Sequence, residues 1–125
     1  MVPVIWQKNT QNNEWFDFLR LDLSSSYFSG KRGVFVIWYI SPSGSKVIKV
    51  GSGNLLEQFK NFRVNPSILQ YSKNGPLKIS WVAVNGVLQE GQMLGVEAYL
   101  YDNYSPIIGE RPQAPSPIPV NLIGK

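Results

Sequence analysis

The sequence contains neither histidine nor cysteine, and these two absences exclude several kinds of chemistry. No disulfide can form, and a zinc site of the usual nitrogen or sulfur type lacks its ligands. A Ser-His-Asp triad and a Cys-His nucleophile pair are excluded for the same reason. Acid–base chemistry therefore has to use a carboxylate, a phenol, an amine or water, and any metal has to be a hard cation held by oxygen ligands.

Long apolar runs are also absent from the chain. No stretch approaches the roughly eighteen apolar residues that a membrane-spanning helix needs, and the opening Met-Val-Pro-Val-Ile-Trp lacks the features of a secretion signal. We therefore expect a cytoplasmic protein with no membrane partner. The residues that are present are typical of a folded globule, because 43% are apolar and 13% are aromatic. A chain of 125 residues is long enough for one ordinary domain.

Positive charge is concentrated in the middle of the chain. From Lys31 to Lys78 there are eight basic residues and one acid, Glu57, whereas the rest of the chain has four basic residues and seven acids. A basic region can bind phosphate groups or an acidic partner, and it can equally be a set of scattered, solvated side chains. The candidates for contact with nucleic acid are Lys31, Arg32, Lys46, Lys49, Lys60 and Arg63.

The residue pattern predicts an α+β domain. Residues 34–40 are apolar on both faces, which predicts a central strand covered on both sides. The turn residues 41–45 and a second strand, 46–50, predict a hairpin. Residues 51–54 are expected to break this strand and cap a helix, and residues 77–84 to form a third strand. Further helices are expected at 14–20, 55–62, 67–71 and about 90–103.

The two ends of the chain differ in character. Residues 1–29 are expected to form an N-terminal extension, whose helix at 14–20 is capped by Asn12 or Asn13 and has acids in its first turn. Residues 30–125 are expected to form the main domain, a small three-stranded antiparallel sheet flanked by helices. Its C-terminal tail is proline-rich and therefore extended. The apolar residues near its end indicate that the tail packs back on the domain.

Two short signatures and their surroundings resemble GIY-YIG endonuclease domains. Gly33-Val34-Phe35, followed after thirteen residues by Lys49-Val50-Gly51-Ser52, is similar to the paired signature of that family. A helix, a third strand, a helix bearing Glu97 and a closing Pro119-Val120-Asn121 then follow in the family's order. The resemblance spans residues 30–123, and it implies the three-stranded sheet with flanking helices that the pattern also predicts.

The resemblance implies phosphodiester hydrolysis with one divalent metal, usually magnesium. In such nucleases a tyrosine of the first signature helps to activate water, and a second tyrosine supports the site by hydrogen bonding. An arginine on the first helix stabilises charge at the phosphate, and a glutamate on the later helix holds the metal. Magnesium prefers oxygen ligands, so this chemistry needs neither histidine nor cysteine.

Most of the catalytic positions that the resemblance implies are occupied by other residues in this chain. Glu97 is retained as the implied metal ligand, and Asn121 is a peripheral match. Losing one charge-stabilising group at such a site typically costs about 3–4 kcal/mol. We therefore expect a domain that does not cleave by the family's mechanism and needs no cofactor. The positions of the two tyrosines, the arginine and a frequent histidine are occupied by Phe35, Lys49, Gln58 and Phe62.

Lys49 has two interpretations at this stage. Its ammonium group is the best substitute cation for binding phosphate. Alternatively, Lys49 pairs with Glu97 across the site, takes the place of the metal and neutralises the carboxylate. The second interpretation predicts that magnesium binds weakly.

Three functions remain open. The domain can be an inactive nuclease-like module that binds DNA or RNA through its basic residues. It can be an inactive module that binds a protein partner or a second copy of itself, using aromatic residues such as Trp6 and Trp15 and the proline-rich tail. It can also be a weak divalent-metal-dependent endonuclease that uses Glu97, with magnesium as its cofactor.

Overall fold

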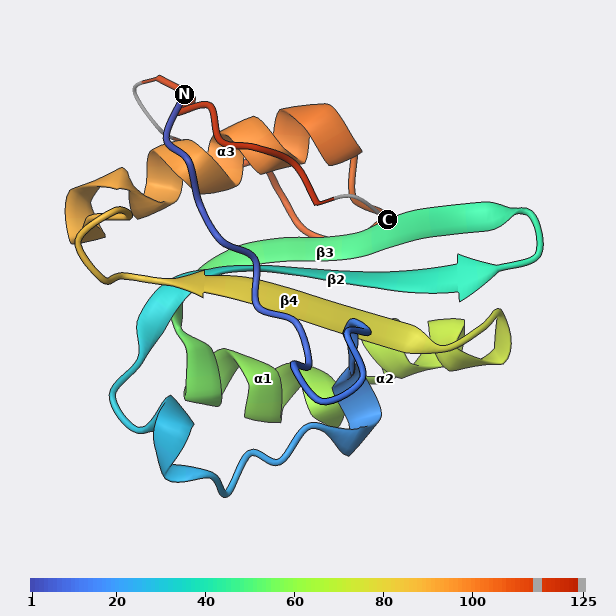
Figure 1. Ribbon diagram of the computed structural model, residues 1–125. Helices are drawn as coiled ribbons and strands as arrows, with labels where there is room; N and C mark the ends of the chain where they lie inside the picture. The colour runs from blue at the N-terminus through green and yellow to red at the C-terminus, as the bar shows by residue number, and fades with distance from the viewer. Residues whose placement is uncertain (114–115, 124–125) are drawn as a thin grey trace.

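A computed structural model describes residues 1–113 and 116–123 of the chain (Figure 1). Parts of the predicted tail, including Pro115 and Lys125, therefore lie outside the described residues. The fold is α+β and contains one four-stranded antiparallel sheet with strand order β1-β4-β2-β3. The strands are β1 (Phe16–Asp17), β2 (Arg32–Ser41), β3 (Gly44–Asn54) and β4 (Leu77–Ala83). The α-helices are α1 (Leu55–Arg63), α2 (Pro66–Leu69) and α3 (Met93–Tyr104).

The sheet carries a separate hydrophobic core on each face. α3 packs on one face together with both ends of the chain, and α1 and α2 pack on the opposite face with the segment that precedes β2 (Figure 1). β2 is the central strand, as predicted, because it pairs with β3 on one side and β4 on the other. Its side chains alternate between the cores: Val34, Val36 and Trp38 enter one, and Phe35 and Ile37 enter the other.

The predicted α+β class, the central strand and the β2–β3 hairpin are confirmed, but the predicted count of three strands was wrong. The fourth strand, β1, comes from the segment 14–20 that was predicted to be helical. Asn12 Oδ1 accepts a hydrogen bond from the Glu14 N–H at 3.0 Å, so it caps a turn and not a helix. Phe16 then pairs with the edge of β4 and stacks on Trp81 with ring centroids 5.3 Å apart. This pairing and stacking outweigh the local preference for a helix.

β3 continues through the glycines that were predicted to break it. A Cβ atom on Gly51 would lie 2.5 Å from Cζ of the Phe35 ring, so the missing side chain makes room for that ring. The strand ends at Asn54, whose Oδ1 accepts a hydrogen bond from the Glu57 N–H at 3.0 Å and caps α1 as predicted. α3 begins at Met93, after a short 3₁₀ turn at 90–92, and thus slightly later than predicted.

The two ends of the chain are tied to each other on the α3 side of the sheet. Val2 forms a parallel bridge with Val120. The Asn121 carboxamide accepts from the Val4 N–H at 2.7 Å and donates to the Val4 carbonyl at 2.9 Å. The Trp6 indole N–H donates to the Asn121 carbonyl at 2.9 Å. The prediction that the tail packs back on the domain is confirmed for the described part of it.

Candidate functional site

Four polar side chains gather at the outer edge of β3, and we call Lys49, Ser52, Gln58 and Glu97 the β3-edge cluster. The Ser52 hydroxyl donates to Glu97 Oε1 at 2.6 Å. Gln58 Nε2 donates to the Ser52 carbonyl at 3.2 Å. Ser52 therefore joins α1 and α3 to the edge strand. Ser52 stands in the second signature, but the sequence assigned it no role.

The local structure explains how these side chains meet. β3 is an edge strand, and it leads directly into α1, so the first turns of α1 lie beside the last residues of the strand. Gln58 is the fourth residue of α1 and turns back toward the strand. Glu97 lies in the second turn of α3, the helix that packs on the other side of β3. The resemblance to a nuclease signature had grouped Lys49, Gln58 and Glu97 in one candidate site.

The environment of Glu97 disfavours its charged form. Burial raises the pKa of the Glu97 carboxyl, and the hydrogen bond from Ser52 and the charge of Lys49 act in the opposite direction. Among the described side chains Lys49 and Glu97 form no direct ion pair, so the predicted bridge between them was wrong in that form. Lys49 instead extends over the Phe62 ring, with Nζ 5.6 Å from the ring centroid.

Phe35, at the position of the implied catalytic tyrosine, is completely buried. Its ring packs edge-on against Phe59 at 5.3 Å and lies 6.0 Å from the Phe62 ring. The ring therefore belongs to the core on the α1 side of the sheet. The ring has no hydroxyl group and therefore contributes no polar atom to the β3-edge cluster.

Two of the basic residues predicted to contact nucleic acid already bind other groups of the protein. Arg32 forms an ion pair with Glu90, with Nε and Oε1 2.7 Å apart. The Arg63 guanidinium donates to the main-chain carbonyls of Phe18 at 2.5 Å and of Leu21 at 2.7 Å. Burial lowers the pKa of Arg63. Arg63 therefore fastens the segment before β2 to α1.

The other candidate lysines point outward. Lys46 and Lys60 are exposed, and neither forms an ion pair with a described acid. Lys31 Nζ lies 4.9 Å from the centroid of the Tyr27 ring. Asn121 lies outside the β3-edge cluster, because its carboxamide is fully engaged by the main chain of Val4.

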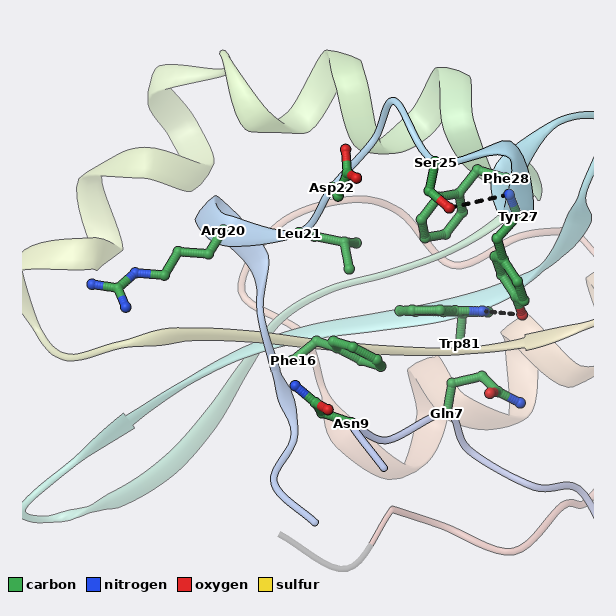
Figure 2. Close-up of a pocket in the computed structure, with 10 residues that line it drawn as sticks. All are labelled: Gln7, Asn9, Phe16, Arg20, Leu21, Asp22, Ser25, Tyr27, Phe28 and Trp81. Carbon is green, nitrogen blue, oxygen red and sulfur yellow. Dashed lines mark hydrogen bonds between the residues drawn. The ribbon is translucent and has the colours of Figure 1, made fainter. Parts of the chain in front are cut away.

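A second candidate site lies at the opposite edge of the sheet, and nothing in the sequence indicated it. This pocket has a volume of about 390 Å³, and we call it the aromatic pocket (Figure 2). Trp81 crosses its middle and donates from Nε1 to the Tyr27 hydroxyl at 3.0 Å. The lining residues are Gln7, Asn9, Phe16, Arg20, Leu21, Asp22, Ser25, Tyr27, Phe28 and Trp81.

The aromatic pocket depends on long-range contacts. Gln7 is held beside β4 because its N–H donates to the Trp81 carbonyl at 3.1 Å, while its carbonyl accepts from the Ser80 hydroxyl at 2.6 Å. Leu21 is held by Arg63 from α1. The residues that meet here are up to 74 positions apart in the chain, so no local pattern could have predicted the pocket.

Within residues 1–113 and 116–123, no group of three or more acidic residues is placed to hold a metal ion together. None of the helices found there has the length and apolar character needed to cross a membrane. No protein-family model matches the chain, and no curated protein or solved structure shows a significant similarity to it.

Proposed function

We propose that this protein binds nucleic acid without cutting it, through Lys49 of the β3-edge cluster and through the exposed lysines Lys46 on β3 and Lys60 on α1. The observation that carries the proposal is the state of Lys46, Lys49 and Lys60. None of the three forms an ion pair with a described acid, whereas Arg32, Lys78 and Arg111 do. Lys46 and Lys60 are exposed and Lys49 extends over the Phe62 ring, so no ion pair with a described residue neutralises any of the three charges.

The β3-edge cluster lacks groups that would promote hydrolysis. Phe35 offers no hydroxyl to activate water and is buried in the core. Gln58 is uncharged, and its carboxamide already donates to the Ser52 carbonyl. Glu97 accepts from the Ser52 hydroxyl, so one of its carboxylate oxygens is already engaged. These features favour binding over catalysis, because phosphoryl transfer needs positive charge at the phosphate and an activated nucleophile.

Binding through lysine contacts to phosphate has a recognisable signature. Affinity falls steeply with salt, because each neutralised phosphate releases a counterion, and preference for sequence is weak. The proposal therefore predicts low-salt binding to DNA or RNA of unrelated sequences.

The test is a titration of fluorescently labelled DNA and RNA, single-stranded and duplex, followed by anisotropy over a series of salt concentrations. Lys49→Gln should weaken binding to every sequence and reduce the slope of log affinity against log salt by about one. Lys73→Gln is the matched control, since Lys73 is an exposed lysine on the short 3₁₀ helix after α2 and makes no ion pair with a described acid. Absence of binding at low salt, or equal losses in both variants, would overturn the proposal.

A second measurement separates binding from cleavage. The wild-type protein is incubated with the same nucleic acids and magnesium or manganese, and we expect the strands to remain intact. Metal-dependent cleavage that disappears in Glu97→Ala would contradict the proposal and establish a nuclease that uses this carboxylate.

A further inference from the structure

We propose that the aromatic pocket receives one unpaired nucleobase, and that the protein therefore prefers single strands to duplexes. This preference rests on the proposed function, because it adds a base-binding site to the phosphate-binding lysines. Three features of the pocket point to a base: its accessible aromatic rings, the hydrogen-bonding groups that its carboxamides leave available and the arrangement of charge around it.

The walls suit a flat, apolar ligand. Trp81 is 3% exposed and lies between Phe16, which stacks on its ring, and Phe28, so the accessible aromatic surface comes from parts of the Phe16 and Tyr27 rings (Figure 2). Phe28 and Leu21 close the side opposite Phe16. A volume of about 390 Å³ is at the small end of the range for ligand sites. Every nucleobase has a π-face, so the accessible parts of the Tyr27 and Phe16 rings can contact a base with little regard to sequence.

Two carboxamides at the rim of the pocket, those of Gln7 and Asn9, can form hydrogen bonds with the edge of a base (Figure 2). The main chain of Gln7 is fixed by its hydrogen bonds to Trp81 and Ser80, but its carboxamide makes no hydrogen bond to a described residue. Asn9 Oδ1 accepts from the Gln11 N–H at 3.0 Å, which leaves the Asn9 amide N–H groups available. A carboxamide carries one acceptor and two donor hydrogens, the same groups that line the Watson–Crick edges of bases.

The charges around the pocket favour an uncharged base inside it and phosphate groups outside it. Asp22 lines the pocket, and hydrogen bonds from Ser24 lower the pKa of its carboxyl, so the group is negative at neutral pH. It repels a phosphate and leaves the pocket to the uncharged part of a nucleotide. Lys31, in contrast, lies against the outer wall, above the Tyr27 ring. Arg20 points away from the other lining side chains (Figure 2).

A single strand can reach both sites along one end of the molecule. Arg32 at the start of β2 pairs with Asn54 at the end of β3, so the β3-edge cluster and Lys31 lie near the same end of the sheet. The Leu55 N–H at the start of α1 donates to the Lys31 carbonyl at 3.0 Å. The path from Ser52 to the pocket therefore runs past the N-terminus of α1 and then past Lys31.

The first experiment uses the wild-type protein and needs no variant. Adenosine and uridine, which have no phosphate, are titrated while the indole N–H signals of the four tryptophans are followed by NMR. We expect the Trp81 signal to shift and the Trp38 signal, from the opposite core, to stay in place. No shift for either nucleoside, or an equally strong shift with a proline-rich peptide, would overturn the proposal.

The second experiment uses Gln7→Leu, which keeps the size of the side chain and removes its polar atoms. Nucleosides and single strands should bind about tenfold more weakly, which corresponds to the loss of one or two hydrogen bonds, while duplex binding stays unchanged. Gln113→Leu, at an exposed glutamine, is the matched control. Equal losses on single strands and duplexes, or no loss, would contradict base recognition.

The two proposals fail in different ways. Lys49→Gln should weaken the binding of single strands and of duplexes equally, and it should leave the binding of nucleosides unchanged. If nucleosides do not bind but the lysine dependence remains, the nucleobase pocket is overturned and the proposed function stands. If nucleosides bind and no oligonucleotide does, both the preference for single strands and the proposed function are overturned.

Discussion

The two edges of the sheet are built in different ways. At the β3 edge, polar side chains from β3, α1 and α3 meet through hydrogen bonds centred on Ser52. At the β4 edge, Phe16 and Tyr27 surround Trp81, and the polar groups lie on the rim. The β3 edge carries the short motif that is visible in the sequence, whereas the β4 edge exists only because distant segments fold together.

One helix, α1, contributes side chains to both edges. Gln58 on α1 reaches the Ser52 carbonyl at the β3 edge. Arg63, five residues later, points the other way and holds the carbonyls of Phe18 and Leu21 beside the aromatic pocket. Two polar residues of one helix therefore bind different partners, because the helix directs their side chains to different sides.

The largest expected effect concerns Arg63. Arg63→Ala removes two charge-assisted hydrogen bonds and leaves two carbonyls without their donor, so we expect a loss of about 3 kcal/mol in the free energy of unfolding, measured in urea. Lys60→Ala, on the exposed side of the same helix, should change it by less than about 0.5 kcal/mol. An Arg63→Ala protein of normal stability that binds nucleic acid poorly would show that this guanidinium contacts phosphate.

The second prediction concerns the clamp that holds the N-terminal segment, and with it Gln7, at the β4 edge. Asn121→Ala removes two hydrogen bonds to the main chain of Val4, and we expect it to lower the free energy of unfolding by about 2 kcal/mol. Asn103→Ala is the matched control, because Asn103 is exposed and makes one short-range hydrogen bond, to the Tyr99 carbonyl. Chemical denaturation of both variants tests the difference, and equal stabilities would contradict the clamp.

The third prediction adds a hydroxyl to the buried ring of Phe35 on β2. Phe35→Tyr buries a polar group where the ring already fills the space over Gly51, so we expect a loss of about 1–2 kcal/mol of stability and no gain of metal-dependent cleavage. Phe62→Tyr, at a half-buried ring, should cost less, because its hydroxyl can reach water. The measurements are thermal unfolding and a cleavage assay with magnesium. Cleavage by the Phe35→Tyr protein would show that Lys49 and Gln58 are compatible with catalysis.

The smallest effect is a dependence on pH. Burial raises the pKa of Glu97 above its ordinary value of 4.5, so the folded protein holds this proton more tightly than the unfolded chain does. The contribution of Glu97 to stability is therefore complete at low pH and is lost as the pH rises from 4.5 through the raised pKa.

Glu97→Gln cannot ionise and should lack this decline, so its stability relative to wild type rises across the same pH range, by less than about 1 kcal/mol. Ser52→Ala removes the hydrogen bond that lowers the pKa and should move the decline to higher pH. Urea denaturation at a series of pH values measures both effects. Parallel pH profiles for wild type and Glu97→Gln would show that this carboxyl is not perturbed by burial.

Elements with strong local signals could be predicted from the sequence. The fully apolar run 34–40 forms the central strand, and Asn54 caps α1 through its own side chain. The segment 14–20 was missed because its helical spacing is real, but the free edge of β4 and the Trp81 ring give Phe16 a better place. Pairing with a distant strand leaves no trace in a local pattern.

Neighbouring residues and short-range periodicity were enough to predict the α+β class and the β2–β3 hairpin. Lys49, Gln58 and Glu97 were grouped only by the resemblance to a nuclease signature, and Ser52 was given no role. Only the tertiary structure decided which hydrogen bonds those residues make: Glu97 bonds to Ser52, and Arg63 turns inward. It also created the aromatic pocket, whose parts come from residues 7–28 and from Trp81. Such contacts depend on which distant surfaces the packing of the sheet brings together, and a linear sequence does not display them.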